Sequence, residues 1–311
     1  MSTETQSQSQ SQSTDIERSF VERIRANPFL TGLLSNRIAV IGLSIIVGMF
    51  VVAIYARFAY DFDTIVDTQF GAHPTAVGPS AEFWFGTDGQ ARDIFPRVLY
   101  GAWYALKFGT ATVLASTVLG ITAGIVAAYY GDLTDNVIMR TMDVLLSFPS
   151  LLLALALVTI FPESLGLWRA VIALTLVYTP RFARVVRGAA LKVLEDEYIE
   201  ATRALGATDP RLLIRHVLPN CLAPITVQST LNYGLAIIDI AALSFLGFGA
   251  NPGDPSWGMM LSEGVERGLF SGAWWWSFFP GLFLALTVLG FNLLGDGMRD
   301  ALDPRMRDAV D

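Results

Sequence analysis

The sequence predicts an all-α polytopic membrane protein with six transmembrane helices. Hydrophobic residues make up 53% of the 311 residues and charged residues only 16%, and the mean hydropathy is +0.49. An ordinary soluble domain carries about 25% charged residues. The apolar residues also gather into six continuous segments between polar stretches. Because about 20 apolar residues suffice to cross a bilayer as a helix, each segment is a candidate span.

The chain begins with a tail at 1–36 whose first half is rich in serine, glutamine and threonine. We expect this tail to be cytoplasmic and partly disordered, because so few apolar residues cannot form a core. The first span is predicted from Ile38 to about Tyr55. A polar stretch then runs to about Tyr100 without a continuous apolar segment of spanning length. We expect it to form a large loop on the outer face.

Three further spans are predicted at about 105–129, 144–161 and 167–184. Pro149 lies inside the second of them and Pro180 near the end of the third. A proline inside a helix removes one backbone hydrogen bond, so we expect a kink at both positions.

The last two spans are predicted at about 224–248 and 274–294. The second of these opens with three consecutive tryptophans, Trp274, Trp275 and Trp276. Indole rings favour the water interface of a bilayer, so we expect these rings at the outer membrane surface.

The basic residues predict the orientation of the chain. With the N-terminus inside, fifteen of the 21 lysines and arginines fall on the cytoplasmic side and six on the outer side. The outer six are Arg57, Arg92, Arg97, Lys107, Arg169 and Arg267. Cytoplasmic loops are enriched in basic residues, so we expect both termini and the charged stretch between the fourth and fifth spans to be cytoplasmic.

That charged stretch, from Leu191 to Pro219, is predicted to form two short helices with a bend between them. In its first half, apolar residues recur at spacings of three and four: Leu191, Leu194, Tyr198, Ala201 and Leu205. This spacing predicts one apolar stripe on one helix. Gly206 is expected to end that helix, and Asp209 followed by Pro210 predicts the N-cap and first turn of a second helix. We expect Pro219 to end the second helix.

Several kinds of site are excluded by composition. Cys221 is the only cysteine, so the chain cannot form an internal disulfide. His73 and His216 are far apart and have no partners at metal-ligand spacing. Neither of the two lysines, Lys107 and Lys192, follows a glycine, so a Walker A loop is absent. The net charge of -7 and the scarcity of lysine favour a salt-adapted, halophilic source.

Four motifs give the chain a family resemblance. Glu200-Ala201-Thr202, followed by Gly206 and then by Leu218-Pro219, resembles the EAA loop of ABC importer permeases, which docks on an ATPase subunit. The other three motifs are FGTDGQARD at 85–93, where Ala91 replaces the usual glycine, PSWG at 255–258, and the C-terminal NLLGDGMRDALDP at 292–304. In this combination the sequence resembles the C-type permease subunits of dipeptide and oligopeptide importers.

The resemblance implies the type I ABC importer permease fold. It implies a permease core at 101–304 with a coupling-helix loop at 185–220, preceded by the first span and outer loop at 37–100 and followed by a cytoplasmic tail at 305–311. The implied role is that of a non-catalytic subunit of an ATP-driven importer of di- or oligopeptides in the cell membrane, multi-pass with both termini cytoplasmic.

The implied partners are a second homologous permease, two ATPase subunits, an extracellular substrate-binding protein and the lipid bilayer, with no nucleic acid. The ATPase subunits would bind ATP and Mg, and we expect no cofactor or metal in this chain.

The candidate functional residues form two groups. Those expected to couple the permease to its ATPase are Glu200, Ala201, Arg203, Gly206, Asp209, Leu218 and Pro219. Asp239 lies inside the fifth predicted span, where an unpaired carboxylate costs roughly 2.5–3.5 kcal/mol. It must therefore be paired, hydrated or protonated, and a role in lining or gating the pathway and a purely structural role remain equally open.

Three alternatives remain at this point. The importer could carry nickel complexes or sugars in place of peptides. A secondary transporter driven by an ion gradient through Asp239 is the second, although the sequence shows neither internal repeats nor several intramembrane carboxylates. The third is a membrane anchor or assembly factor without a transport path.

Overall fold

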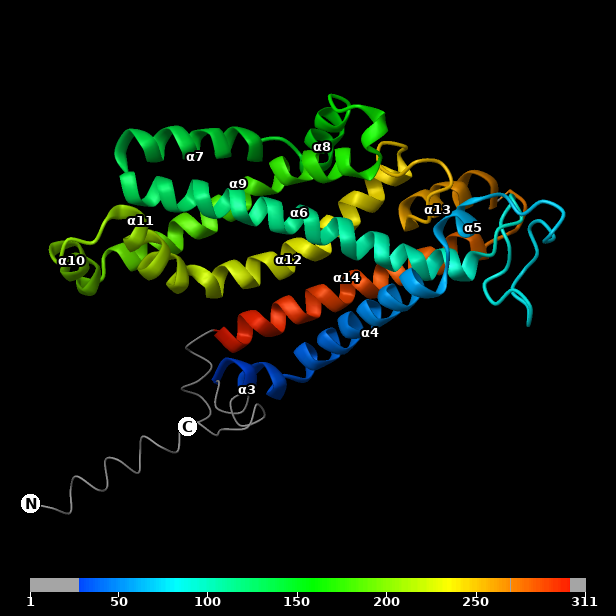
Figure 1. The fold of residues 1–311 in the computed structure, drawn as a ribbon, viewed down its shortest axis with the longest axis horizontal. Helices are drawn as coiled ribbons and strands as arrows, with labels where there is room; N and C mark the ends of the chain where they lie inside the picture. Colours follow the sequence, from blue (N-terminus) through cyan, green and yellow to red (C-terminus); the bar gives the residue numbers. More distant parts are fainter. Residues whose placement is uncertain (1–27, 269, 303–311) are drawn as a thin grey trace, which may run out of the picture.

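The computed structural model describes residues 28–268 and 270–302, and the residues described are helical with two isolated β-bridges and no strand. The expectations for the tails at 1–27 and 303–311, including Arg18, Arg23 and Arg25, lie outside the described residues. Six long helical passages form an elongated bundle (Figure 1). They are α4 (Arg37–Ala59), α6 (Ile94–Tyr130), α7 (Asp132–Leu146) with α8 (Ser150–Val158), α9 (Leu167–Leu194), α12 (Leu218–Phe245) and α14 (Trp275–Leu302).

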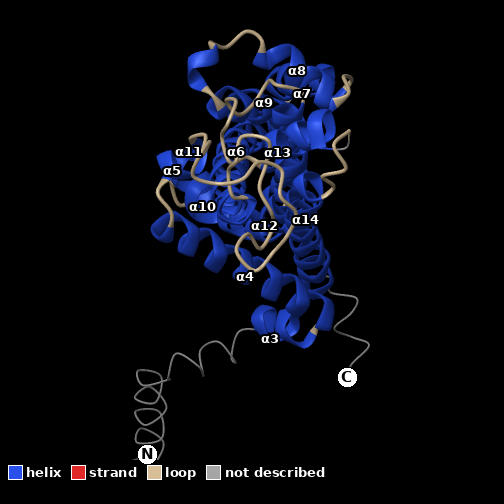
Figure 2. Ribbon diagram, turned by 90° about the vertical axis from the view of Figure 1, so that its right-hand side faces the viewer, coloured by secondary structure: helices blue, strands red, loops and turns tan. Residues whose placement is uncertain are grey.

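Short helices lie at the two ends of the bundle, and Figure 2 shows the bundle along its long axis. One end carries α3 (Pro28–Ser35), α10 (Glu197–Ala204), α11 (Asp209–Leu212) and the π-helix η2 (Leu213–Val217). The other end carries α5 (Phe62–Val66), α13 (Trp257–Glu263), the π-helix η3 (Gly264–Gly268) and the loop before α6. A short 3-10 helix, η1 (Glu163–Leu165), joins α8 to α9.

The six predicted spans are all helical, but they are not six equal apolar rods. Among the described residues, four helices are long and apolar enough to cross a membrane: α4, α6, the continuous helix at 209–245, and α14. The predicted span at 144–161 is wrong as a single rod, because α7 and α8 meet at 94°. They count as a fifth span if they form one bent span. The remaining passage, α9, is not among these apolar helices. It carries Arg169, Arg181, Arg184 and Arg187, which lower its mean hydropathy.

The predicted kinks differ in extent. Pro149 stands immediately before α8, where the bend separates α7 from α8. Pro180 lies inside α9 without interrupting it. The prediction at Pro149 is therefore confirmed, and the chain at Pro180 keeps its helical path.

α6 begins eleven residues before the predicted start of its span. The Asp93 carboxylate accepts a hydrogen bond from the Phe95 amide at 3.0 Å and caps the helix at Ile94. With 37 residues, α6 extends beyond the thickness of a bilayer and joins the two ends of the molecule.

Glycines let α6 and α9 pack closely. A Cβ at Gly120 would collide with the Cβ of Phe182, and one at Gly124 would lie 2.6 Å from the carbonyl oxygen of Ala183. Small residues at helix contacts are typical of membrane bundles, where close packing replaces the hydrophobic effect.

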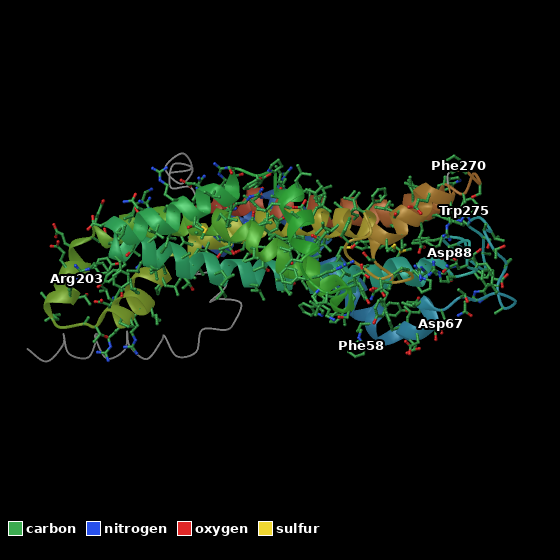
Figure 3. The ribbon with its side chains drawn as sticks, turned by 90° about the horizontal axis from the view of Figure 1, so that it is seen from above. Phe58, Asp67, Asp88, Arg203, Phe270 and Trp275 are labelled. Atoms are coloured by element: carbon green, nitrogen blue, oxygen red, sulfur yellow. The ribbon has the colours of Figure 1, made fainter. Side chains whose placement is uncertain are left out.

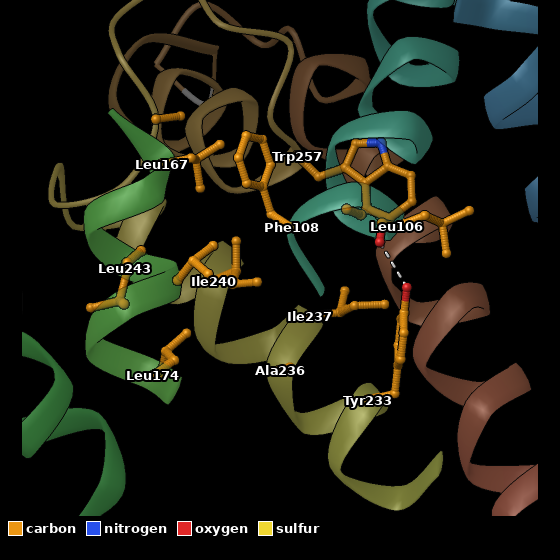
Figure 4. Packing of buried hydrophobic residues seen from close by; sticks show 14 of the residues in the cluster. Leu106, Phe108, Leu167, Leu174, Tyr233, Ala236, Ile237, Ile240, Leu243 and Trp257 are labelled. Atoms are coloured by element: carbon orange, nitrogen blue, oxygen red, sulfur yellow. Dashed lines mark hydrogen bonds between the residues drawn. The ribbon is translucent and has the colours of Figure 1, made fainter. Parts of the chain in front are cut away.

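The core lies where α6, α9, α12, α13 and α14 meet (Figure 4). Its buried side chains are apolar, and two aromatic residues also hydrogen-bond to the α6 backbone. The Tyr233 hydroxyl donates to the Leu106 carbonyl oxygen at 2.8 Å. The Trp257 indole donates to the Val98 carbonyl oxygen at 2.9 Å. These bonds fix α12 and α13 to α6.

A buried ion-pair group closes the end of the bundle that carries α13. The Arg92 side chain donates from Nε to Asp88 at 2.6 Å and from Nη2 to Glu263 at 2.9 Å. The second buried arginine, Arg97, donates to the carbonyl oxygens of Ile65 and Gly253 at 2.9 and 3.0 Å. Arg92 thereby joins the loop before α6 to α13, and Arg97 joins α6 to α5 and to the loop that precedes α13.

The three tryptophans at the start of α14 do not share one environment. Trp274 is exposed, as expected for an interfacial ring, but Trp276 is buried and Trp275 is half-buried. Both of these indoles donate to the Thr87 carbonyl oxygen, at 2.9 Å from Trp276 and 3.3 Å from Trp275. The prediction of three interfacial rings therefore fails for two of them, because the loop at 85–93 covers them. In that loop Ala91 is buried with φ of 60°, a left-handed conformation more typical of glycine.

We predict that Gly120→Ala destabilises the bundle by about 1–3 kcal/mol, because the added methyl group overpacks the contact with Phe182. Gly48→Ala is the matched control, since Gly48 is also helical and has no atom within 4 Å of an added Cβ. Thermal unfolding in detergent should show a lower midpoint for the first variant alone. Equal midpoints would contradict close packing at Gly120.

Candidate functional site

The predicted helix pair is present, with different boundaries. α9 ends at Leu194, and α10 begins only at Glu197, so the apolar stripe from Leu191 to Leu205 on one helix is wrong. Gly206 has φ of +84° and ends α10, as predicted. Asp209 is not the N-cap of α11: that position belongs to Thr208, and Asp209 is the first helical residue.

The second helix continues through the predicted stop. Pro219 does not end the helix: it is the second residue of α12, directly after η2, and α11, η2 and α12 follow one another without a break. η2 is a π-helix of five residues. The coupling segment therefore continues directly into a membrane helix.

One hydrophobic cluster attaches this segment to the bundle. Buried residues from α10, α11, η2 and α12 contact buried residues of α6 and α9. The members are Ile125, Ala128, Val186, Ala190, Ile199, Leu212, Val217, Cys221 and Ile225. We call this group the anchor cluster. Ile199 was missed because the predicted stripe followed its neighbours Tyr198 and Ala201, both of which are exposed.

Polar contacts link Arg203 and Asp209 through Tyr129 at the end of α6. The Tyr129 hydroxyl donates to the Asp209 carboxylate at 2.6 Å. The Arg203 guanidinium lies 5.4 Å from the centre of the Tyr129 ring, within the range of a cation–π contact. Tyr129 was not among the predicted site residues. Its position next to the end of the α6 span is the only sequence signal that it gave.

A second tyrosine, Tyr198, links α10 to the start of α12. The Asn220 side-chain amide donates to the Tyr198 hydroxyl at 3.0 Å and to the His216 carbonyl oxygen at 2.7 Å. Partial desolvation raises the pKa of the Tyr198 phenol above its ordinary value of about 10, and the group is neutral at pH 7. It connects α10 to the first turn of α12.

Most predicted coupling residues lie on the surface. Glu200, Ala201, Arg203, Gly206, Asp209 and Pro219 are exposed, and Leu218 is half-buried against the anchor cluster. Glu200 forms no hydrogen bond or ion pair within the described part of the chain, so its side chain is free for a contact outside this subunit. The surface also presents Leu205, which is 89% exposed, and Ile214. Figure 3 shows Arg203 at one end of the molecule, far from Asp88 at the other.

Asp239 belongs to a separate group on α12. Its carboxylate accepts a hydrogen bond of 2.7 Å from the Tyr178 hydroxyl on α9. The Arg181 guanidinium lies 5.3 Å from the centre of the Tyr178 ring. The requirement for a partner is thus met by a tyrosine hydroxyl. Within the ranges 28–268 and 270–302, no group of histidine, cysteine, aspartate and glutamate side chains has the arrangement of a metal site.

Comparison with known proteins agrees with this geometry. The family model described as "Binding-protein-dependent transport system inner membrane component" matches residues 120–308. The dipeptide transport system permease protein DppC of Alkalihalophilus pseudofirmus is 44% identical over 88% of this chain and 88% of its own. The glutathione transport system permease protein GsiD of Pectobacterium atrosepticum is 40% identical over 90% of this chain and 91% of its own.

A solved structure shows the same fold at low identity. One inward-facing crystal form of the MetNI methionine ABC transporter aligns with a TM-score of 0.54 and 20% identity. The alignment covers 68% of this chain and 98% of that chain.

We predict that Leu212→Ala loosens the coupling segment, because the cavity left in the anchor cluster costs about 2–5 kcal/mol. Trypsin should then cut faster after Arg203 and Arg211 in the detergent-purified protein. Leu205→Ala is the matched control, since it removes the same side-chain atoms at an exposed position. Similar cleavage rates for the two variants would show that the cluster does not hold the segment.

Proposed function

Because the chain belongs to the family of binding-protein-dependent transport system inner membrane components, as a type I ABC importer permease, we propose that it carries di- or oligopeptides and is driven through α10 and α11. The anchor cluster is the observation that carries this proposal. A subunit docked on α10 and α11 would move α6, α9 and α12 together, since all three contribute buried side chains to that cluster.

The proposed docking residues are Glu200, Ala201, Arg203, Gly206, Asp209, Leu218 and Pro219. Exposure of six of them supports this role, and the nearby exposed Leu205 and Ile214 supply apolar area for a protein contact. Apolar residues within a polar rim are typical of protein interfaces. The energy source would be ATP and Mg bound by two ATPase subunits.

The peptide substrate is proposed from the relatives. Two of them are named for dipeptide and glutathione transport, and a third, from Pseudomonas aeruginosa, for di- and tripeptides at 43% identity over 75% of this chain. Glutathione is itself a small peptide derivative, so the three names share one chemical class. Nickel complexes or sugars gain no support from these names.

We further propose a second homologous permease beside this one and an extracellular substrate-binding protein at the α13 end. α7 has no buried residue in the isolated chain, and α8 exposes Leu152, so both helices offer surface to another subunit. We place α10 and α11 in the cytoplasm together with both termini. This agrees with the excess of basic residues predicted on the cytoplasmic side. It also agrees with the start of α4 and the end of α14, which lie toward the same end of the bundle as α10 (Figure 1).

The alternative of an ion-driven carrier rests on Asp239. Its bond to the Tyr178 hydroxyl supports a structural role, and the family supports an ATP-driven importer. Asp239 as a residue of the pathway remains part of the proposal, because it is only half-buried.

We predict that Gly206→Val uncouples ATP hydrolysis from transport. Valine strongly disfavours the φ of +84° at this bend, so α10 and α11 should lose their fixed angle while the membrane helices stay folded. Peptide uptake into vesicles containing the complete importer should fall at least tenfold, with ATP hydrolysis retained.

Gly247→Val is the control for backbone strain. Gly247 has φ of +83° and equally open surroundings, but it follows α12 at the opposite end of the span. Transport that persists in Gly206→Val, or that is lost equally in both variants, would contradict a coupling role for the bend.

A further inference from the structure

A polar hollow of about 580 Å³ lies between α7 and α9, apart from the coupling residues. It is lined by Asp135, Asn136, Met139, Arg140, Asp143, Arg184 and Arg187. The size is that of a typical small-molecule site. α7 runs beside α6 and α9 in the half of the bundle that carries α10 and α11 (Figure 1).

The charges in this hollow need water or protein around them. A charged side chain that faces acyl chains is costly, so charged groups on membrane helices turn toward bundle interiors or aqueous cavities. On α7 they gather on one face, whereas Leu133 and Val137 lie outside the hollow and are exposed. This amphipathic pattern predicts water on one face of α7 and lipid or protein on the other.

Ion pairs neutralise all but one of the charges. Arg187 forms a two-pronged pair with Asp135, at 2.5 and 2.6 Å. Arg184 pairs with Asp143 at 2.5 Å. Arg140 is exposed and forms no ion pair within the described part of the chain, although it lies in the same hollow.

The unpaired group determines what the hollow attracts. Four charges cancel in two pairs and one guanidinium remains, so the hollow carries a net positive charge. A guanidinium presents parallel N–H donors that match the two oxygens of a carboxylate. Every unmodified linear peptide carries such a carboxylate at its C-terminus.

We propose that the hollow between α7 and α9 is a segment of the translocation pathway, where Arg140 binds the terminal carboxylate of a peptide in transit. The inference rests on the proposed peptide substrate. The paired aspartates hold Arg184 and Arg187, which leaves Arg140 as the binding group. A single exposed guanidinium gives a transient contact, as a pathway requires.

Cysteine labelling tests whether the hollow is aqueous. Cys221 is fully buried, so the wild-type protein provides an unreactive background. In the assembled importer without nucleotide, Asn136→Cys should react with a charged, membrane-impermeant thiol reagent at least tenfold faster than Val137→Cys. These two neighbours are both exposed on α7, but only Asn136 lines the hollow. Equal rates, or protection of Asn136→Cys by the second permease, would overturn the proposal.

Transport of a matched peptide pair tests the role of Arg140. One dipeptide has a free C-terminal carboxylate and the other a C-terminal amide, and the pair is chosen for equal affinity to the binding protein. Arg140→Ala should reduce uptake of the free acid roughly tenfold or more and leave uptake of the amide unchanged, since only the free acid loses a charged hydrogen bond. Arg140→Lys keeps the positive charge but lacks the two parallel N–H donors of the guanidinium. It should therefore restore part of the lost uptake of the free acid.

The outcomes separate the two levels of the proposal. If the wild-type importer moves neither peptide, the peptide substrate is wrong. If the wild type transports both and Arg140→Ala impairs them equally, Arg140 serves folding or lipid contact, and only the carboxylate site is overturned. Unchanged uptake of both peptides by Arg140→Ala would overturn it as well.

Discussion

The anchor cluster is the contact on which the rest of the structure depends. Ile199 of α10 and Leu212 of α11 are both buried among side chains of α6, α9 and α12. Apolar contacts of this kind are non-directional and resist separation, because separating them exposes the apolar area of every member at once. This segment and these three helices therefore form one packed unit, so a subunit docked at the exposed bend, as proposed above, would act on the membrane helices without an intermediate flexible link.

α6 carries that connection across the molecule. Its C-terminal end contributes Ile125 to the anchor cluster and Tyr129 to the bond with Asp209. Its middle packs on α9 through Gly120 and Gly124, and its N-terminal end accepts the Trp257 indole of α13. Arg92 then ties the preceding loop to Glu263. One long helix thus contacts the structures at both ends of the bundle.

The sequence predicted what depends on composition and on local backbone chemistry. Apolar length located the helical passages, Pro149 marked the bend, and Gly206 marked the left-handed turn. It failed where tertiary contacts decide. Pro219 begins a helical turn because α11 and η2 already lead into α12, and Trp276 is buried because a distant loop covers it. The phase of α10 was misjudged because Tyr198, Ile199 and Ala201 could each be buried, and only the tertiary packing against α6, α9 and α12 selects Ile199.

The π-helix η2 sets which residues on either side of it face the bundle. A π-helical turn holds about one residue more than an α-helical turn, so the side chains before it are rotated by about 100° relative to those after it. Leu212 and Val217 are five residues apart and can therefore both face the bundle, and Cys221 follows four residues later on the same buried face of a chain that continues unbroken into α12. Deletion of a single residue there would turn the outward face by the same angle. The register of one turn thus sets which surface the permease presents, independently of the membrane-embedded packing.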